Sequence, residues 1–410
     1  MKVLRLIILA GLFSVTIHAQ KVKTGIEVLQ SNGFKQLANK RVGLITNPTG
    51  VNRQLQSTID ILFNASNVKL TALYGPEHGV RGDHSAGDKV DFFTDSKTGL
   101  PVYSLYGKNK KPGAEILKDI DILVYDIQDI GSRSYTYIST LGLAMEAAAE
   151  NNIKMVILDR PNPLGGIKME GLVTEPAFTS FVSQFPIPYV HGLTVGELAL
   201  FLNGEKLLKD DIQCDLEVIS MEGWQRSMSF EDTGLPWIPS SPHIPHAYSP
   251  YFYPVSGILG ELYIYNIGVG YTLPFQLFAT EWINADSLTA NLNQLNLEGI
   301  LFRPVHFKPY YSVSKGSMVH GVQVHFIDYH KAPLSLVQFY VLQEAYKLWP
   351  EKNVFELCDK QRISMFDKVC GSDKIRIEFT KRWMVEDIKE LWFKDIKGFK
   401  SKASQYFLYD

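Results

Sequence analysis

The chain has 410 residues, 45% of them hydrophobic and 20% charged. This is the balance of a folded globular protein with about two or three domains. The 41 basic and 43 acidic residues give a formal net charge of -2, and no charged run stands out. The composition therefore excludes a strongly basic nucleic-acid binder, and we expect no nucleic-acid partner.

The first residues have the pattern of a secretory signal peptide. Lys2 and Arg5 precede the apolar run 6–17, and Ala19 offers a cleavage site before Gln20. The run is short for a bilayer span, and no cysteine follows it to carry a lipid. We predict that residues 1–19 are removed and that the protein is exported to the periplasm or the extracellular space, without a stable membrane anchor. An uncleaved anchor is the alternative.

Short apolar runs alternate with helical patterns between residues 40 and 190. Strands are expected at 41–46, 68–74, 101–105, 120–127, 154–158 and 187–190. Helices are expected at 55–63, 113–118, 138–151 and 195–203, the last opened by a capping box of Thr194 and Glu197. This alternation predicts an α/β domain with a mostly parallel sheet that is covered on both faces.

The pattern changes after residue 214. The proline-rich stretch 237–245 continues neither a helix nor a central strand, so we place a domain boundary just after it. Beyond it, strands are expected at 302–307, 318–326 and 374–379, and a helix at 334–347. The predicted division is an α/β domain over residues 20–246 and a smaller α+β domain over residues 247–410.

Polar and charged side chains follow five of the expected strands. The carboxyl ends of parallel strands meet at one edge of a sheet, which is where ligands bind in open α/β folds. Their convergence suggests an active site, whereas the alternative is that Asp and Asn only cap helices and turns. The candidates are Asn47, Glu77, His78, Arg81, Asp126, Asp129, Arg133, Tyr135, Asp159, Arg160, Asn162 and His191.

Glu77 is the sharpest catalytic candidate. A Gly-Pro turn fixes the backbone before it, and Gly79 and Gly82 permit close approach after it. A carboxyl group partly shielded from water has a raised pKa and can serve as a general acid at neutral pH. Asp126 and Asp129 are its candidate partners, as base, nucleophile or orienting group.

The other candidates have both a binding and a structural interpretation. Arginine presents a planar fork to carboxylates, so Arg81, Arg133 and Arg160 could bind an anionic group of a substrate. Asp159 could equally form a structural ion pair with Arg160. The histidines, His78 and His191, could contact a ligand or orient a carboxylate, or could be structural.

Several function classes lack their motifs. The chain has no G-x-G-x-x-G at the first crossover, no P-loop, no G-x-S-x-G and no H-E-x-x-H. The first of these absences argues against a nucleotide-dependent oxidoreductase. The three cysteines, Cys214, Cys358 and Cys370, form no zinc motif and allow one disulfide at most, between the last two. We expect no metal and no cofactor.

Six stretches in order make the chain similar to a known family. They are VGLITNPTG at 42–50, YGPEHGVRG at 74–82, YDIQDIGSR at 125–133, LDRPNPLGG at 158–166, HGLTVGE at 191–197 and WIPSSPHIP at 237–245. In these stretches the chain resembles the exo-β-N-acetylmuramidases of bacterial cell-wall recycling. The resemblance implies a Rossmann-like N-terminal domain, a smaller C-terminal domain and an active site in the cleft between them.

The resemblance also implies a reaction. The substrates would be glycan fragments of peptidoglycan, from whose non-reducing end N-acetylmuramic acid is removed, with Glu77 as the catalytic acid. An arginine could bind the lactyl carboxylate, and Trp237 and Tyr135 could cover the apolar face of the sugar. Retaining, inverting and substrate-assisted routes remain open. A non-catalytic muropeptide-binding protein is the alternative function.

One segment departs from the family pattern. Ile267 and Val269 stand where relatives often carry charged residues, so a contact between the nearby Glu261 and substrate is left open.

Overall fold

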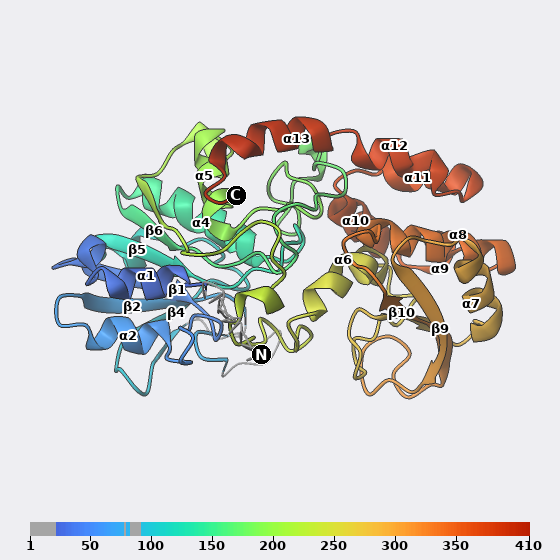
Figure 1. Ribbon diagram of the computed structural model, residues 1–410, viewed down its shortest axis with the longest axis horizontal. Coiled ribbons are helices and arrows are strands. Elements are labelled where there is room, and N and C mark those ends of the chain that lie inside the picture. Colours follow the sequence, from blue (N-terminus) through green and yellow to red (C-terminus); the bar gives the residue numbers. More distant parts are fainter. Residues whose placement is uncertain (1–21, 78, 83–91) are drawn as a thin grey trace, which may run out of the picture.

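The computed structural model describes residues 22–77, 79–82 and 92–410, and it contains two sheets that belong to different parts of the chain (Figure 1). The larger sheet has seven strands in the order β3-β4-β2-β1-β5-β6-β7, of which only β3 is antiparallel to its neighbour. Its strands are β1 (Arg41–Thr46), β2 (Lys69–Gly75), β3 (Phe92–Thr94), β4 (Pro101–Ser104), β5 (Ile122–Asp126), β6 (Lys154–Leu158) and β7 (Leu216–Ile219).

The chain order reverses at the centre of this sheet. From β1 it runs outward through β2 and β4, and it then returns to add β5, β6 and β7 on the other side of β1. The crevice at the carboxyl ends of β1 and β5 is therefore a topological switch point, the usual ligand site of a Rossmann-like sheet. The predicted fold class is confirmed.

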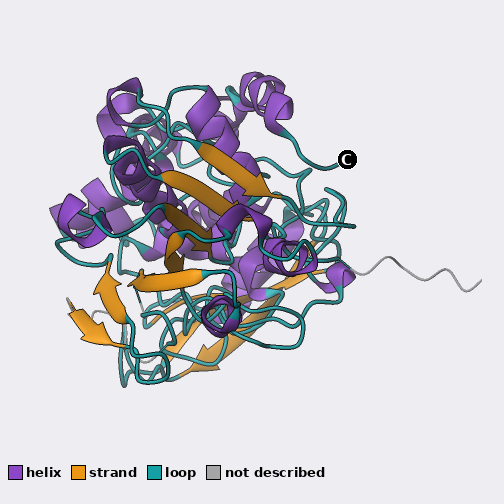
Figure 2. Ribbon diagram, turned by 90° about the vertical axis from the view of Figure 1, so that its left-hand side faces the viewer, coloured by secondary structure: helices purple, strands orange, loops and turns teal. Residues whose placement is uncertain are grey.

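Helices cover both faces because the strands are apolar on both. In β5, Leu123 and Tyr125 pack in the core that contains α4 and α5, while Ile122 and Val124 pack in the core that contains α1 and α2. Figure 2 views this part of the molecule with strands in orange and helices in purple. The helices are α1 (Gly25–Ser31), α2 (Thr58–Asn64), α3 (Ala114–Leu117), α4 (Tyr137–Glu150) and α5 (Val195–Gly204).

The smaller sheet lies in the C-terminal part and is antiparallel, in the order β8-β10-β9. Its strands are β8 (Leu277–Thr280), β9 (Ile300–Phe307) and β10 (Val319–Phe326). Helix α6 (Ser249–Gly260) leads into it, and α7 (Ala285–Gln294) and α8 (Val337–Leu348) pack in the same core. The remaining helices are α9 (Val354–Leu357), α10 (Lys360–Cys370), α11 (Lys374–Arg382), α12 (Glu386–Phe393) and α13 (Ile396–Ala403).

The last helix returns to the larger sheet, as Figure 1 shows in red along the upper edge. Phe399 of α13 lies 5.3 Å, ring to ring, from Phe201 of α5, and both belong to the core beneath α4 and α5. The C-terminal residues thus help to bury the N-terminal sheet.

Two of the expected strands are wrong. Residues 187–190 are buried but form only isolated bridges, because Pro188 has no N–H to donate to a strand ladder. Residues 374–379 lie in helix α11, where Ile375 and Phe379 are buried one helical turn apart and Ile377 is exposed. Their alternating sequence imitates a strand. The capping box at Thr194 and Glu197 is confirmed.

Arg133 joins the two parts of the molecule. It is 1% exposed, and no carboxylate of the described residues pairs with it. Its Nε donates to the Ser183 hydroxyl, its Nη1 to the carbonyls of Leu172 and Ile187, and its Nη2 to those of Val369 and Cys370. The last two carbonyls end helix α10, where the helix dipole favours a cation. Burial lowers the pKa of Arg133 to about 10, so it is still charged at neutral pH.

Replacing Arg133 with methionine should unfold the protein more easily. Arg133→Met leaves several buried carbonyls without donors, so we expect the free energy of unfolding in urea to fall by about 3 kcal/mol or more. Arg382→Met is the matched control, because that side chain is 70% exposed and its ion pair with Asp387 lies at the surface. Equal losses in the two variants would contradict this role of Arg133.

Candidate active site

Glu77 lies at the edge of the sheet where β2 ends, two residues after Gly75. Its side chain is half-buried, and the phenol of Tyr106, on the loop after β4, lies close to it. Burial and then the neighbouring Glu77 carboxylate raise the pKa of Tyr106 to about 12, so the phenol keeps its proton at neutral pH. The charge of Glu77 also acts on Tyr137, the first residue of α4, where it adds to the effect of burial in raising the pKa of the phenol. The structure therefore positions Glu77 through a neighbouring phenol.

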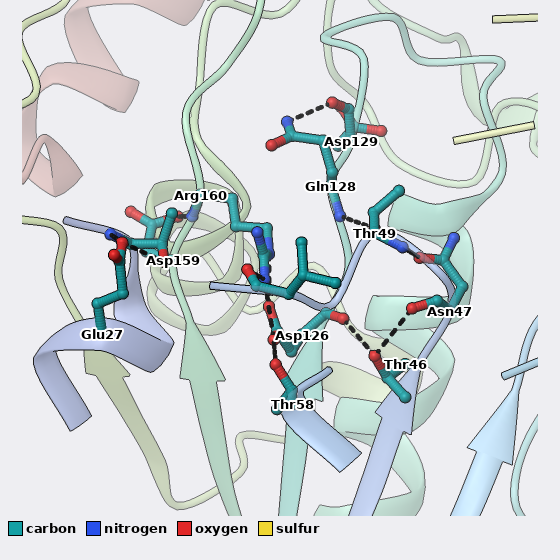
Figure 3. A network of polar contacts seen from close by, with 12 residues as sticks. Glu27, Thr46, Asn47, Thr49, Thr58, Asp126, Gln128, Asp129, Asp159 and Arg160 are labelled. Carbon is teal, nitrogen blue, oxygen red and sulfur yellow. Dashed lines mark hydrogen bonds and ion pairs between the residues drawn. The ribbon is translucent and has the colours of Figure 1, made fainter. Parts of the chain in front are cut away.

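Asn47 follows β1 directly and is held in one orientation. Its Oδ1 accepts the N–H of Thr49 at 3.0 Å, and the Thr49 hydroxyl in turn accepts the N–H of Gln128 at 2.9 Å (Figure 3). The Asn47 Nδ2 is buried near the Tyr137 phenol but is in hydrogen-bond geometry with no described residue. An amide donor is thus available at the end of the central strand.

Asp129, after β5, offers the matching acceptor. One of its oxygens, Oδ2, accepts the N–H of Gly131 at 2.7 Å and lies 3.3 Å from Nε2 of His191. His191 Nδ1 accepts the N–H of Leu193, so in the neutral ring the hydrogen is on Nε2, which is near Asp129 but forms no hydrogen bond to a described residue. The other oxygen, Oδ1, is buried with no partner among the described residues. A buried unpaired polar atom costs about 1–3 kcal/mol, which a polar ligand would recover.

Asp126, unlike Asp129, has protein partners for both of its carboxylate oxygens. It is fully buried, and Arg160 binds it with two nitrogens, at 2.5 Å from Nε and 3.0 Å from Nη2, while Thr58 donates its hydroxyl at 2.5 Å (Figure 3). Both oxygens therefore have strong partners. Of the two aspartates predicted to assist Glu77, the geometry favours Asp129 and gives Asp126 a structural ion pair.

The three arginines are also engaged by the protein itself. Arg81 binds Asp95 at 2.6 Å and Asp60 at 3.0 Å, and Arg133 joins the two parts of the chain. Arg160 binds Asp126 and the Val51 carbonyl. Only its Nη1 has no protein partner among the described residues, and Arg160 lines a pocket of about 20 Å³ that holds little more than a water. Arg81 and Arg133 therefore make contacts within the protein, and we had expected them to bind an anionic group of a substrate.

Asp159 and Asn162 shape the backbone. Asp159 is fully buried and accepts the hydroxyl of Tyr409, near the C-terminus, at 2.5 Å. It also accepts the Thr194 hydroxyl and the Gly196 N–H, each at 2.8 Å, and so caps α5. Asn162 bonds the backbone of Leu164 and Leu193. His78 lies outside the described residues.

Aromatic rings line the boundary between the two parts. The Tyr135 ring lies 5.0 Å from Tyr137 and 5.6 Å from Tyr253 of α6, and its hydroxyl bonds Ser240 at 2.8 Å. Trp237 packs edge-on against Phe230, and its indole donates to a backbone carbonyl. Tyr135 is therefore close to both parts.

Sequence reasoning missed Tyr106 and Tyr253. Neither residue lies in a charged motif, and only the tertiary fold brings them to Glu77 and Tyr135.

The side chains at this edge of the sheet are of the kinds found in the active site of a glycoside hydrolase. A half-buried acid, a second carboxylate with an unpaired oxygen and aromatic rings are the groups with which such enzymes cleave sugars. No group of three or more His, Cys, Asp or Glu in the described part of the chain is placed to hold a metal. No helix there is long and apolar enough to cross a membrane.

The chain belongs to the exo-β-N-acetylmuramidase family. The models for the N-terminal and C-terminal parts of exo-β-N-acetylmuramidase NamZ match residues 42–248 and 251–409. The peptidoglycan β-N-acetylmuramidase NamZ of Bacillus subtilis (strain 168) is 45% identical over 394 residues, 96% of this chain and 93% of that protein. The resemblance read from the six stretches is confirmed.

Two crystal structures of DUF1343 family proteins from Bacteroides fragilis have the same fold. One is 60% identical with a TM-score of 0.92, and the other is 30% identical with a TM-score of 0.77. In both cases 95% of this chain and 99% of the other chain are covered.

The buried Asp159 should make stability depend on pH, and its contact with Tyr409 should weaken that dependence. Burial raises the pKa of Asp159 to about 6, above its value of about 3.9 in an unfolded chain, so its ionisation costs stability as the pH rises between these values. The Tyr409 hydroxyl opposes this by lowering the pKa. Tyr409→Phe should therefore reduce the free energy of unfolding more at pH 7 than at pH 4, as urea denaturation would show.

Tyr406→Phe is the matched control for this measurement. Its hydroxyl donates to Glu205, which is outside the core, at 3.0 Å. A loss in Tyr409→Phe that is the same at both pH values would contradict the assignment.

Proposed function

We propose that this protein is an exo-acting glycoside hydrolase that releases N-acetylmuramic acid from the non-reducing end of peptidoglycan fragments. The observation that carries the proposal is the position of Glu77, beside the Tyr106 phenol at the carboxyl edge of the sheet, in a chain of the exo-β-N-acetylmuramidase family. The named Bacillus relative, 45% identical, supports the same reaction and substrate.

Each polar group at the edge of the sheet has a role in binding or hydrolysis that suits its chemistry. Glu77 gives its proton to the oxygen of the glycosidic bond, and Tyr106 keeps the carboxyl group in place. Asn47 Nδ2 and Asp129 Oδ1 have no partner among the described residues, so the first can donate to an oxygen of the sugar and the second can accept from a hydroxyl or an amide N–H. Asp129 is also the proposed second catalytic carboxylate, oriented by Gly131 and His191.

Hydrolysis of an aryl β-N-acetylmuramide tests this assignment. Glu77→Gln keeps the shape of the side chain but removes the proton donor, so kcat should fall about a hundredfold or more, the usual size of general acid catalysis. Asp129→Asn should also lose most turnover, with its thermal midpoint close to that of the wild type.

Glu115→Gln is the matched control, because Glu115 is an exposed residue in α3. Full turnover in Glu77→Gln would move the acid elsewhere. Binding of muramic acid without turnover in the wild type would favour the alternative, a non-catalytic muropeptide-binding protein.

We further propose that the chain is exported and acts in the periplasm or outside the cell. The support is the sequence alone, with Lys2 and Arg5 before an apolar run and Ala19 at the expected cleavage site. Peptide mapping of the protein recovered from its own host should place the N-terminus at Gln20, and Ala19→Arg should block that cleavage. An N-terminus at Met1 in protein recovered from the cytoplasm would overturn the proposal.

A further inference from the structure

The C-terminal part contains a pocket of about 200 Å³ that the catalytic groups do not use. It lies between the end of α6, the loop that follows this helix and the loop before β10. Its principal lining residues are Tyr253, Glu261, Tyr263, Tyr265, Phe275 and Ser312. The volume suits one sugar ring, and the aromatic side chains suit its apolar face.

The pocket adjoins the proposed catalytic site. Tyr253 lines the pocket and also meets Tyr135, whose ring contacts Tyr137. Tyr253 is close enough to both Asp129 and Glu261 for the two charges to act on it. The charge of Glu77 acts on Tyr137, so Tyr137, Tyr135 and Tyr253 link the surroundings of the proposed acid to the pocket.

Two polar groups of the pocket have no protein partner among the described residues. Tyr265 is 1% exposed, and its hydroxyl forms no hydrogen bond. The Glu261 side chain is half-buried and forms no hydrogen bond or ion pair with a described residue, and burial raises the pKa of its carboxyl group. The nearby Arg362 instead stacks on the Tyr263 ring, 3.5 Å from its centroid. A ligand with hydroxyl and amide groups would supply both missing partners.

The charge of the pocket decides which sugar it fits. Among the described residues that line the pocket, Glu261 is the only acidic one, and none is a lysine, arginine or histidine. The lactyl carboxylate of N-acetylmuramic acid would be repelled there, whereas a neutral N-acetylhexosamine presents hydroxyl and amide donors to Glu261. In peptidoglycan, the sugar on the leaving side of a muramic acid is the neutral N-acetylglucosamine.

We propose that this pocket binds the N-acetylglucosamine ring from which the terminal muramic acid is cleaved, with Glu261 and Tyr265 as its polar contacts. The inference rests on the proposed function and extends it, because it assigns recognition of the leaving group to the C-terminal part. The N-terminal sheet would hold the muramic acid and the acid catalyst.

Two substrates that differ only in the leaving group test the proposal. One is an aryl β-N-acetylmuramide, and the other is the disaccharide of N-acetylmuramic acid β-linked to N-acetylglucosamine. Glu261→Gln and Tyr265→Phe should each lower kcat/KM for the disaccharide about tenfold, as expected for one lost polar contact. Both variants should leave kcat/KM for the aryl substrate within about twofold.

Matched controls exist in the same part of the chain. Glu281→Gln changes an exposed glutamate, and Tyr340→Phe changes a half-buried tyrosine on α8, and neither should alter either rate. Neither test substitution removes an internal hydrogen bond, so thermal midpoints should match the wild type. An equal loss on both substrates, or no loss on the disaccharide, would overturn the proposal.

A binding measurement separates this proposal from the proposed function. If the wild type cleaves neither substrate, the hydrolase function fails, but the pocket can still be tested by saturation-transfer NMR with N-acetylglucosamine. A signal that Glu261→Gln abolishes and Glu281→Gln keeps would support the pocket. No signal, or equal signals in both variants, would overturn it.

Discussion

The buried guanidinium of Arg133 is the contact on which the arrangement of the two parts depends. It donates to backbone carbonyls from the loops above the larger sheet and to the last carbonyls of α10, so one side chain satisfies acceptors from both parts. The same loop carries Asp129 before it and Tyr135 after it. Fixing Arg133 therefore also fixes where the proposed second carboxylate and the aromatic boundary lie relative to α6.

Further contacts restrain the same arrangement from other directions. The Glu170 carboxylate accepts the N–H and the hydroxyl of Ser335 at the start of the region that leads into α8. At the C-terminus, α13 packs on α5, and Tyr409 reaches Asp159 at the end of β6. Because these contacts are far apart, the two parts resist rotation about any single one, and Tyr135 and Tyr253 keep their packing.

The sequence predicts the parallel sheet well because its strands are buried on both faces, which leaves uninterrupted apolar runs such as 41–46 and 154–158. The prediction from sequence fails where an apolar pattern typical of a strand belongs to another backbone conformation, as in the buried segment around Pro188 and in helix α11. It also finds the charged edge of the sheet, but it does not distinguish Asp126 from Asp129. Both follow β5, and only the tertiary structure shows that Arg160 and Thr58 occupy the first and leave an oxygen of the second unpaired.

Glu77 and Glu261 show how one residue type is suited to two tasks. Glu77 lies beside the Tyr106 phenol, which keeps its proton and can donate to the carboxyl group before a substrate arrives. Glu261 is half-buried and has no hydrogen-bond partner among the described residues, so its burial is compensated only when a ligand donates to it. Catalysis calls for the first environment and recognition for the second. The proposed division between the N-terminal acid and the C-terminal sugar pocket thus follows from how each carboxyl group is partnered.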